Sequence, residues 1–414
     1  MRAIFDLHRI MYGLALFACW ALISGNAALA KSEHDHTTGA PEPAKPTNHM
    51  IKELALPEGL GSSQSIAVDS AGRVWFTEKI GKKLGMYDPD KKEFVIHPIP
   101  ASWGNIGFSN ITLSPDGEIW FTVTRWADEG AEDTYMLGKF TPTDGYFTKY
   151  DLPHKSIPEE LIIDAKGIIW FFASNKNNLY RVDSKTFSLK GYPIPTENGH
   201  PRSLASDQNG HIWFVESNAN KIGNFIPEQE IFHEYEVLTP FANPGKISID
   251  QHGRIWFVEV TANRIGVFSP DKKRFDEVII PTPGSSPVAL ANDNNGNIWF
   301  LEYKGNKVGV FNAEKATFHE YDIPNYSSLP ANMAIDHKRS ILWFTQSSTE
   351  AKRLGMLPIN DALAAIKKQD MATTHSAVEK ASSEGNSKWI LLLAAIIAIA
   401  LLGGLLARKS RKGT

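Results

Sequence analysis

The stretch that decides the fold is Ile247-Ser-Ile-Asp250-Gln-His-Gly253-Arg-Ile-Trp256-Phe257-Val-Glu259, followed by Asn263-Arg-Ile-Gly266-Val-Phe268. An apolar run ends at an Asp, a Gly follows three residues later, and the next apolar run carries Trp-Phe. An Asp and a Gly at this spacing are typical of a tight turn between antiparallel strands, because Gly tolerates positive φ. The stretch therefore predicts a hairpin followed by a third short strand.

The same pattern recurs along most of the chain. Trp-Phe occurs seven times, beginning at Trp75, Trp120, Trp170, Trp213, Trp256, Trp299 and Trp343. Each repeat predicts four strands, and a four-stranded repeat of about 40–45 residues is typical of a β-propeller blade. No helix-sized amphipathic stretch interrupts the repeats, which argues against a solenoid. We therefore expect an all-β protein whose residues 50–358 form a seven-bladed β-propeller with four-stranded blades.

The two ends of the repeat region predict how the ring closes. The seventh repeat supplies three strands and then lapses into Asn360-Asp361-Ala362 without an outer strand. The segment Ile51–Pro57 matches the outer-strand pattern of Phe318–Pro324. We expect this N-terminal strand to complete the last blade and to leave no unpaired edge.

Composition excludes two classes of protein. Lys and Arg number 43 against 46 Asp and Glu, so a net charge of -3 gives no basic field for nucleic acid. A single Cys excludes a disulfide framework and a thiolate zinc site.

The N-terminal region predicts export. Residues 1–30 combine two Arg residues, an apolar run and Ala28-Leu29-Ala30, the pattern of a secretory signal peptide. Cys19 leaves a lipidated N-terminus as the alternative. Residues 31–49 form a polar linker, in which we expect His34 and His36 to be solvated rather than bound to a metal.

The C-terminal region predicts a membrane anchor. Residues 389–407 carry no charge and are long enough for one transmembrane helix, whereas residues 359–388 are a predicted linker. Residues 408–414 hold four basic residues, so the positive-inside rule places this tail in the cytoplasm. We expect the propeller outside the cytoplasm, in the periplasm or at the cell surface.

Carboxylates recur on one predicted face of the disc, where first strands begin and second strands end. The residue three after each Trp is Glu78, Val123, Ala173, Glu216, Glu259, Glu302 or Gln346. We expect the four Glu residues to contribute to a ligand site. The alternative is a structural ion pair within each repeat, with Lys82, Lys221, Arg264 or Lys307.

Loops on the same face add further candidates. The loops that enter the first strands carry His200, Arg202, Glu159, Glu160 and Lys246. The second repeat contains an insertion with Trp126, Asp128, Glu129, Glu132 and Asp133, and the connector before it adds Trp103. We expect Arg202, Trp103 and Trp126 to belong to the ligand site, because loops on rigid scaffolds carry function.

Two of the carboxylates also suggest a metal. Glu259 and Glu302 occupy equivalent positions in neighbouring repeats, and two close carboxylates repel unless a cation or a proton lies between them. Mg²⁺ or Ca²⁺ is the candidate because both prefer oxygen ligands, whereas zinc would require His ligands that are absent here. Neutralisation by Arg264 and Lys307 is the alternative.

The elements Trp-Phe-x-Glu, Asn-x-Ile-Gly and Asp-x-x-Gly make residues 50–358 similar to the virginiamycin B lyase (streptogramin lyase) family of seven-bladed propellers. The resemblance implies an enzyme that linearises a macrocyclic lactone antibiotic by elimination. In that chemistry a His acts as general base and a metal ion polarises the ester carbonyl.

The sequence departs from the family's catalytic pattern, which places His directly after a Pro and two residues ahead of the first strand's first aliphatic residue. The seven residues at this position are Gln64, Ser109, Glu159, Arg202, Gly245, Val288 and Ala331. Arg202 follows Pro201 where the His is expected, and an always-protonated guanidinium cannot accept a proton. His200, one residue before that Pro, is the remaining candidate base.

We therefore expect a membrane-tethered propeller that binds a small ligand or a protein partner on this face without catalysis. A metal-assisted lyase or hydrolase on the same face is one alternative. A scaffold of an envelope complex, docked through the insertion of the second repeat, is another.

Overall fold

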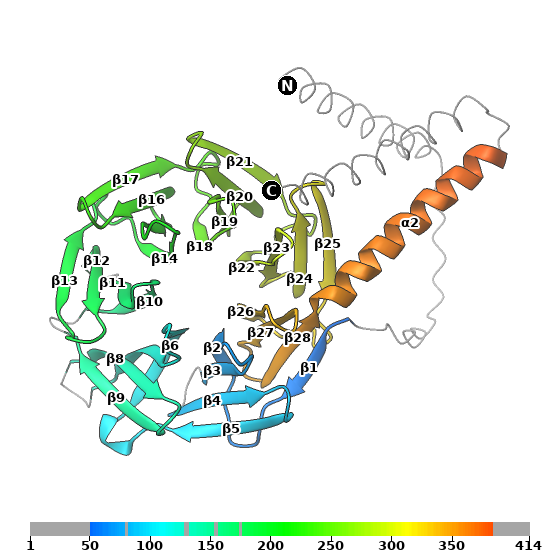
Figure 1. Cartoon of the computed structure of the whole chain (residues 1–414). Coiled ribbons are helices and arrows are strands. Elements are labelled where there is room, and N and C mark those ends of the chain that lie inside the picture. Colours follow the sequence, from blue (N-terminus) through cyan, green and yellow to red (C-terminus); the bar gives the residue numbers. More distant parts are fainter. Residues whose placement is uncertain (1–49, 79–81, 128–131, 153–155, 174–175, 384–414) are drawn as a thin grey trace, which may run out of the picture. The chain divides into compact units, whose positions relative to one another are not determined.

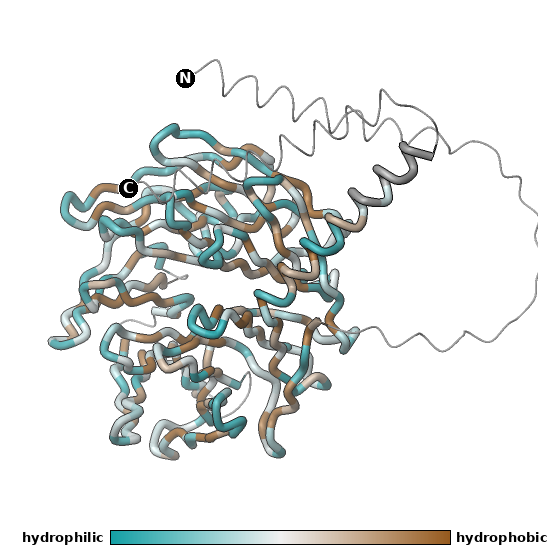
Figure 2. The backbone as a smooth tube through the Cα atoms, turned by 45° about the vertical axis from the view of Figure 1, so that its right-hand side comes forward, coloured by the Kyte–Doolittle hydropathy of each residue, from teal (hydrophilic) through white to brown (hydrophobic). Residues whose placement is uncertain are grey.

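The computed structural model describes residues 50–78, 82–127, 132–152, 156–173 and 176–383. In these residues, 28 strands form seven antiparallel sheets of four strands each (Figure 1). Hydrophobic stretches of the chain alternate with hydrophilic turns (Figure 2). The predicted seven-bladed propeller is confirmed, and we number its blades 1–7 from the sheet that begins with β2.

Each blade has an inner, a second, a third and an outer strand. The inner strands are β2 (Ser63–Val68), β6 (Ile106–Leu113), β10 (Pro158–Ile163), β14 (Pro201–Ser206), β18 (Pro244–Ile249), β22 (Pro287–Asn292) and β26 (Pro330–Asp336). The second strands are β3 (Val74–Glu78), β7 (Ile119–Arg125), β11 (Ile168–Ala173), β15 (Ile212–Glu216), β19 (Ile255–Glu259), β23 (Asn297–Glu302) and β27 (Ile341–Gln346). The third strands are β4 (Lys83–Asp88), β8 (Thr134–Thr141), β12 (Asn178–Asp183), β16 (Lys221–Ile226), β20 (Arg264–Ser269), β24 (Lys307–Asn312) and β28 (Arg353–Pro358). The outer strands are β5 (Glu93–Pro98), β9 (Tyr146–Asp151), β13 (Leu189–Pro193), β17 (Ile231–Glu236), β21 (Arg274–Ile279), β25 (Thr317–Asp322) and β1 (Lys52–Ala55).

The N-terminal strand closes the ring as predicted. β1 pairs with β28 in a register that runs from Lys52 opposite Met356 to Ala55 opposite Arg353. The side chain of Ile51, just before this strand, is 2% exposed and packs into the core between blades 6 and 7. On the turn side, Arg339 of blade 7 also bridges to Asp90 of blade 1 and donates to the carbonyl of Ala71 at 3.1 Å. Blades 7 and 1 are therefore joined by side chains as well as by a shared strand.

The Asp-x-x-Gly turns fix the Trp of the following strand. In blade 5 the Gly253 amide donates to the Asp250 carbonyl at 2.9 Å, which confirms the turn. The Asp250 carboxylate also accepts the indole N–H of Trp256 at 2.9 Å. The same indole bond, 2.9–3.0 Å long, joins Asp69 to Trp75, Asp164 to Trp170, Asp207 to Trp213 and Asp293 to Trp299. The sequence predicted the turn but did not reveal this second role of the Asp.

The Gly of Asn-x-Ile-Gly makes room for the Phe of Trp-Phe. Gly266 on β20 lies opposite Phe257 on β19, and a Cβ added at Gly266 would lie 2.2 Å from the Phe257 ring. Five further blades show the same close approach, at Gly85, Gly138, Gly223, Gly309 and Gly355. In blade 3 the position is Tyr180, whose ring stacks on Phe171 with centroids 5.2 Å apart. The Gly therefore permits dense aromatic packing between the second and third strands.

A helix, α2 (Ile359–Ser383), follows the last blade in the stretch predicted as a linker, residues 359–388. Ile359 and Ala362 are buried against blades 6 and 7, and Tyr321 donates to the Ala362 carbonyl at 3.1 Å. Leu363 and Ile366 extend this contact at helical spacing, which explains why the segment orders. A 3-10 helix, η2 (Ala101–Trp103), lies between blades 1 and 2.

No helix in the part of the chain that the structure describes has the length and apolar character to cross a membrane. The predicted signal peptide, the linker of residues 31–49 with His34 and His36, the predicted span at 389–407 and the tail at 408–414 lie outside the described residues.

Candidate functional site

The third residues of the inner strands, and the equivalent Asn110 in the longer strand β6, connect neighbouring blades around the axis. The hydroxyl of Ser65 accepts the amide of Ile111 at 3.3 Å, and the hydroxyl of Ser203 accepts the amide of Ile247 at 3.2 Å. The carbonyl oxygen of the Asn110 side chain accepts the Leu161 amide at 3.3 Å. These bonds hold the inner strands in a fixed register around the axis.

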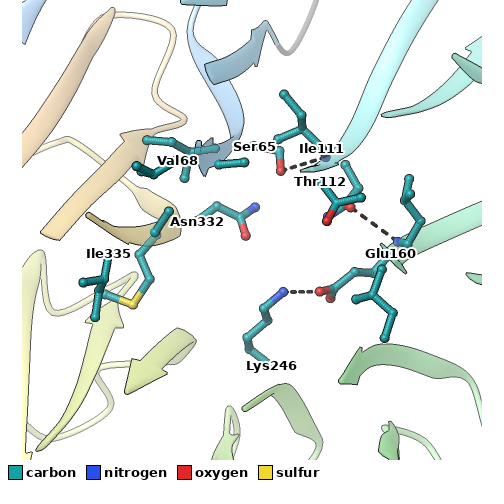
Figure 3. Close-up of a pocket in the computed structure, with 15 residues that line it drawn as sticks. Ser65, Val68, Ile111, Thr112, Glu160, Lys246, Asn332 and Ile335 are labelled. Atoms are coloured by element: carbon teal, nitrogen blue, oxygen red, sulfur yellow. Dashed lines mark hydrogen bonds and ion pairs between the residues drawn. The ribbon is translucent and has the colours of Figure 1, made fainter. Parts of the chain in front are cut away.

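Two residues at this third position are charged and point into the centre of the ring. Glu160 of blade 3 and Lys246 of blade 5 form an ion pair that reaches past blade 4 (Figure 3). Their side chains are 15% and 25% exposed. The pair lines a cavity of about 270 Å³ together with Ser65, Asn110, Asn332 and further residues of the inner strands β2, β6, β10 and β26. The cavity is therefore polar, with one cation and one anion at hand.

The family's catalytic position is the second residue of six inner strands and Ser109 in the longer strand β6; the structure describes all seven residues, and none carries an imidazole. Arg202 is exposed and Glu159 is half-buried. His200 has a φ of 55°, its carbonyl accepts the Ser217 amide at 3.2 Å, and its side chain is half-buried. Near the start of each of the seven inner strands, the structure thus places a residue other than His at the family's catalytic position.

The four predicted Glu residues end the second strands but are not on the surface. Glu216, Glu259 and Glu302 are 0% exposed and Glu78 is 2% exposed. Each lies opposite the first residue of its inner strand, as Glu259 does opposite Pro244. The connector that precedes the inner strand covers these carboxyls, because a Cβ at Gly199 would lie 2.2 Å from a carboxyl oxygen of Glu216. A role in ligand binding stays a prediction for these residues.

The basic residues expected to neutralise these Glu residues bind other carboxylates. Lys221 lies 2.9 Å from Glu234, Arg264 lies 2.9 Å from Glu277, and Lys307 lies 2.5 Å from Asp322. These three acids belong to the outer strands of the same blades. The alternative of an ion pair between each buried Glu and its own loop is therefore wrong for Glu216, Glu259 and Glu302.

The buried carboxyls have strongly perturbed pKa values. Burial, and then the charge of Glu277, raise the pKa of Glu259 to about 8. Burial, followed by the charge of the outer-strand Glu, raises the pKa of Glu216 and that of Glu302 to about 7. Burial also raises the pKa of Glu78, although the Gly61 amide donates to its carboxylate at 3.0 Å and opposes the shift. Three of these groups therefore gain or lose a proton near neutral pH.

The residues do not fit the metal that the family resemblance implies. No group of three His, Cys, Asp or Glu side chains suited to a metal ion occurs among the described residues. Glu259 and Glu302, the predicted pair of metal ligands, each contact the outer-strand Glu of their own blade, Glu277 and Glu320. Arg264 already supplies a positive charge to Glu277.

The two predicted Trp residues of blade 2 have different environments. Trp103 is 4% exposed and packs between Phe121 and Phe147, with ring centroids 6.3 and 6.2 Å away, so it belongs to the core. Trp126 is 37% exposed and lies against Gly107. The Ala127 amide, next in the insertion, donates to Asp133 at 2.9 Å. Of the two, only Trp126 presents an aromatic surface to solvent. Asp128 and Glu129 lie outside the described residues.

The sequence analysis missed the outer-strand acids Glu234, Glu277 and Glu320. A signal was present, because each lies two residues after the Phe that begins an outer-strand motif: Phe232, Phe275 and Phe318. Its significance depended on knowing that the second and outer strands bring two carboxyls together.

The fold, its blade repeats and the inner-strand positions can be compared with known proteins. The family model described as the virginiamycin B lyase family matches residues 49–354. The chain belongs to this family. No curated protein sequence matches the chain.

Solved structures of family enzymes are similar to this chain. The selenomethionine-substituted virginiamycin B lyase from Staphylococcus aureus is 26% identical with a TM-score of 0.64, over 74% of this chain and 98% of that enzyme. A streptogramin B lyase is 25% identical with a TM-score of 0.65, over 74% of this chain and 96% of its own. A catalytically inactive His-to-Ala variant of the Staphylococcus aureus lyase, solved with quinupristin, is 26% identical with a TM-score of 0.64, over 74% of this chain and 98% of its own.

Proposed function

We propose that this chain is a membrane-tethered, extracytoplasmic binding module. It holds a small ligand, or a peptide segment of a partner, at the face where its inner strands begin. It does not open a lactone ring. The observation that carries the proposal is the absence of an imidazole at the family's catalytic position in all seven inner strands, which is the second residue of six strands and Ser109 in the longer strand β6. Replacing one His by Ala makes the Staphylococcus aureus lyase catalytically inactive. A family member with Arg202 after Pro201 lacks a general base at that place.

The chemistry of this face supports binding. The cavity between the inner strands offers the ammonium of Lys246, the carboxylate of Glu160 and the amides of Asn110 and Asn332. The connectors that lead into the inner strands also expose large apolar side chains: Leu238 is 61%, Phe241 89% and Tyr326 88% exposed. A polar cavity and exposed apolar side chains on the connectors suit a ligand with both kinds of group, such as a peptide macrocycle.

Quinupristin is the probe that tests binding. We expect calorimetric titration of the purified full chain to give a saturable heat. The double variant Glu160→Gln, Lys246→Met should weaken binding at least about tenfold, since each bond to a charged group contributes about 1.5–3 kcal/mol. The matched control is Glu228→Gln, Lys166→Met, which removes an exposed ion pair of 3.2 Å in the turns of the opposite face. No heat with the unaltered chain, or equal weakening by both double variants, would contradict the proposed site.

The lyase alternative depends on His200. This residue is the imidazole next to the family position, but its backbone has positive φ and it precedes Pro201 rather than following it. Lyase or hydrolase activity would require this ring to reach the substrate from the connector. A His200→Ala variant that lost a ring-opening activity would favour the enzyme over the binding module.

The membrane tether is part of the proposal. Its support is the uncharged stretch of residues 389–407 and the basic residues that follow it. The scaffold alternative uses the same tether and docks a partner through the blade 2 insertion, where Trp126 is exposed.

A further inference from the structure

Blades 4, 5 and 6 each contain a pair of carboxyl groups, of which the inner one is buried and the outer one is half-buried. The Glu that ends the second strand contacts a Glu of the outer strand: Glu216 with Glu234, Glu259 with Glu277, and Glu302 with Glu320. The first member of each pair is 0% exposed. Among the described residues, no backbone N–H donates a hydrogen bond to its oxygens, and only Glu302 has a neighbouring hydroxyl donor, that of Ser285. A charged carboxylate buried without a donor is costly, so its protonation state has to be explained.

The outer member of each pair is bound as a charged carboxylate. Glu277 accepts the amide of Thr239 at 3.0 Å and its hydroxyl at 2.6 Å, and it accepts a hydrogen bond from Arg264 at 2.9 Å. Thr196 donates in the same way to Glu234, and Thr282 donates in the same way to Glu320. Because these donors stabilise the ionised form, the proton of each pair belongs to the inner member.

Blade 7 provides a natural control for this assignment. Its outer-strand acid is Glu53, which lies opposite Gly355 just as Glu277 lies opposite Gly266. The second strand of blade 7 ends in Gln346, and the Gln346 amide donates to Glu53 at 2.6 Å. Gln has the shape of a protonated Glu and is a donor at every pH. The position therefore requires a hydrogen-bond donor that faces the outer acid.

Blade 1 has the buried Glu but lacks the outer-strand acid. Its outer strand has Ile96 opposite Gly85, so no second acid is present, and Glu78 accepts the Gly61 amide instead. In blades 2 and 3 the second strand has Val123 and Ala173 at the equivalent position. In the seven blades as the structure describes them, a buried Glu without a backbone donor thus occurs only where an outer acid can accept its proton.

We propose that blades 4, 5 and 6 each bind one proton, held by Glu216, Glu259 and Glu302 and shared with the outer Glu, and that the propeller loses stability when these protons leave. The charged groups that face each pair are Lys221 in blade 4, Arg264 in blade 5, and Lys307 with its partner Asp322 in blade 6. Each of these cations binds an outer-strand acid, so deprotonation leaves the inner carboxylate without a counter-ion of its own.

The direction of the pH effect follows from linkage. The raised pKa values of the inner Glu residues mean that the folded chain keeps protons that the unfolded chain has released above its ordinary Glu pKa. Stability from these groups is therefore complete below the ordinary pKa and is lost as pH rises towards the folded values of about 7 to about 8. The pKa of Glu277 is lowered by its donors in spite of burial, so its own contribution is lost only on acidification.

The test compares the full chain with the variant Glu216→Gln, Glu259→Gln, Glu302→Gln between pH 5 and pH 9. For each pair we expect the folding equilibrium constant of the unaltered chain to fall by up to about tenfold per pH unit until the folded pKa is reached. The triple variant should unfold at a higher urea concentration than the unaltered chain at pH 9, and its midpoint should change less with pH. The control Glu228→Gln removes an exposed Glu whose pKa is lowered, so its pH dependence should match that of the unaltered chain.

Infrared spectroscopy supplies a readout that does not depend on unfolding. At pH 7 the unaltered chain should show the C=O band of buried protonated carboxyls, and the triple variant should lack it. A triple variant with the pH dependence of the unaltered chain, or the same C=O band in both proteins, would overturn the proposal. Recovery of the pH 9 midpoint on adding Mg²⁺ or Ca²⁺ would assign the pairs to a cation instead.

Discussion

Replacing Ile51 tests how the ring closes. Ile51 is 2% exposed and packs in the cluster that contains Leu342, Leu357 and Ile359, directly before β1. Ile51→Ala removes three carbons from a site with little room to collapse, which costs about 2–5 kcal/mol. Because β1 pairs with blade 7 over only four residues, the lost packing also weakens the one strand that the N-terminus contributes to the ring.

The assay is thermal unfolding of the purified full chain in mild detergent. A loss of about 2–5 kcal/mol should lower the melting temperature by roughly 4–10 °C for a domain of this size. The matched control is Ile279→Ala in the outer strand β21, where the side chain is 66% exposed and the expected loss is within about 0.5 kcal/mol. If Ile51→Ala melted with the control, β1 would not stabilise the closed ring.

Three further predictions follow from the blade repeat and the chain termini. Gly266→Ala places a Cβ 2.2 Å from the Phe257 ring and should lower the free energy of unfolding in urea by about 1–3 kcal/mol. The control Gly117→Ala meets no atom within 4 Å and should cost only the strain of its positive φ. Equal losses would refute the role of Gly266 in packing. Asp250→Ala leaves the Trp256 indole N–H and two backbone amides without an acceptor and should cost about 2–4 kcal/mol at pH 7, and an unchanged melting temperature would refute the capping role. A protease added outside sealed cells or spheroplasts should digest the propeller and spare an epitope at residues 408–414, and cleavage of that epitope would refute the predicted topology.

The fold could be predicted because its decisive residues lie close together in the sequence. The seven Trp-Phe pairs, each preceded by a tight turn, set the number of blades, and the likeness of Ile51–Pro57 to Phe318–Pro324 predicted the closing strand. Helix α2 was not predicted, because the apolar residues that pack, among them Leu363 and Ile366, are few and contact blades 6 and 7 only in the folded chain.

The candidate site could be predicted only in part. The sequence placed Glu216, Glu259 and Glu302 correctly at the ends of second strands, but their burial depends on the connector from the preceding blade. Their contact with Glu234, Glu277 and Glu320 depends on a pairing across the blade between residues 18 positions apart. Likewise Lys246 and Glu160 were predicted on one face. Whether they form an ion pair past blade 4 depends on the distance between blades 3 and 5 across the ring. Such distances are set by tertiary structure and do not appear in local sequence patterns.

The central claim, that the propeller binds without opening a lactone, is tested most directly by incubating the full chain with quinupristin and separating the products by liquid chromatography with mass spectrometry. Elimination leaves the mass unchanged and hydrolysis adds one water, so retention time and mass together report either ring opening. The Staphylococcus aureus lyase serves as the positive control, and Arg202→His places an imidazole after Pro201 in an otherwise unchanged chain. We expect quinupristin to be recovered intact from the unaltered chain. A ring-opened product that accumulates in proportion to the amount of chain would contradict it.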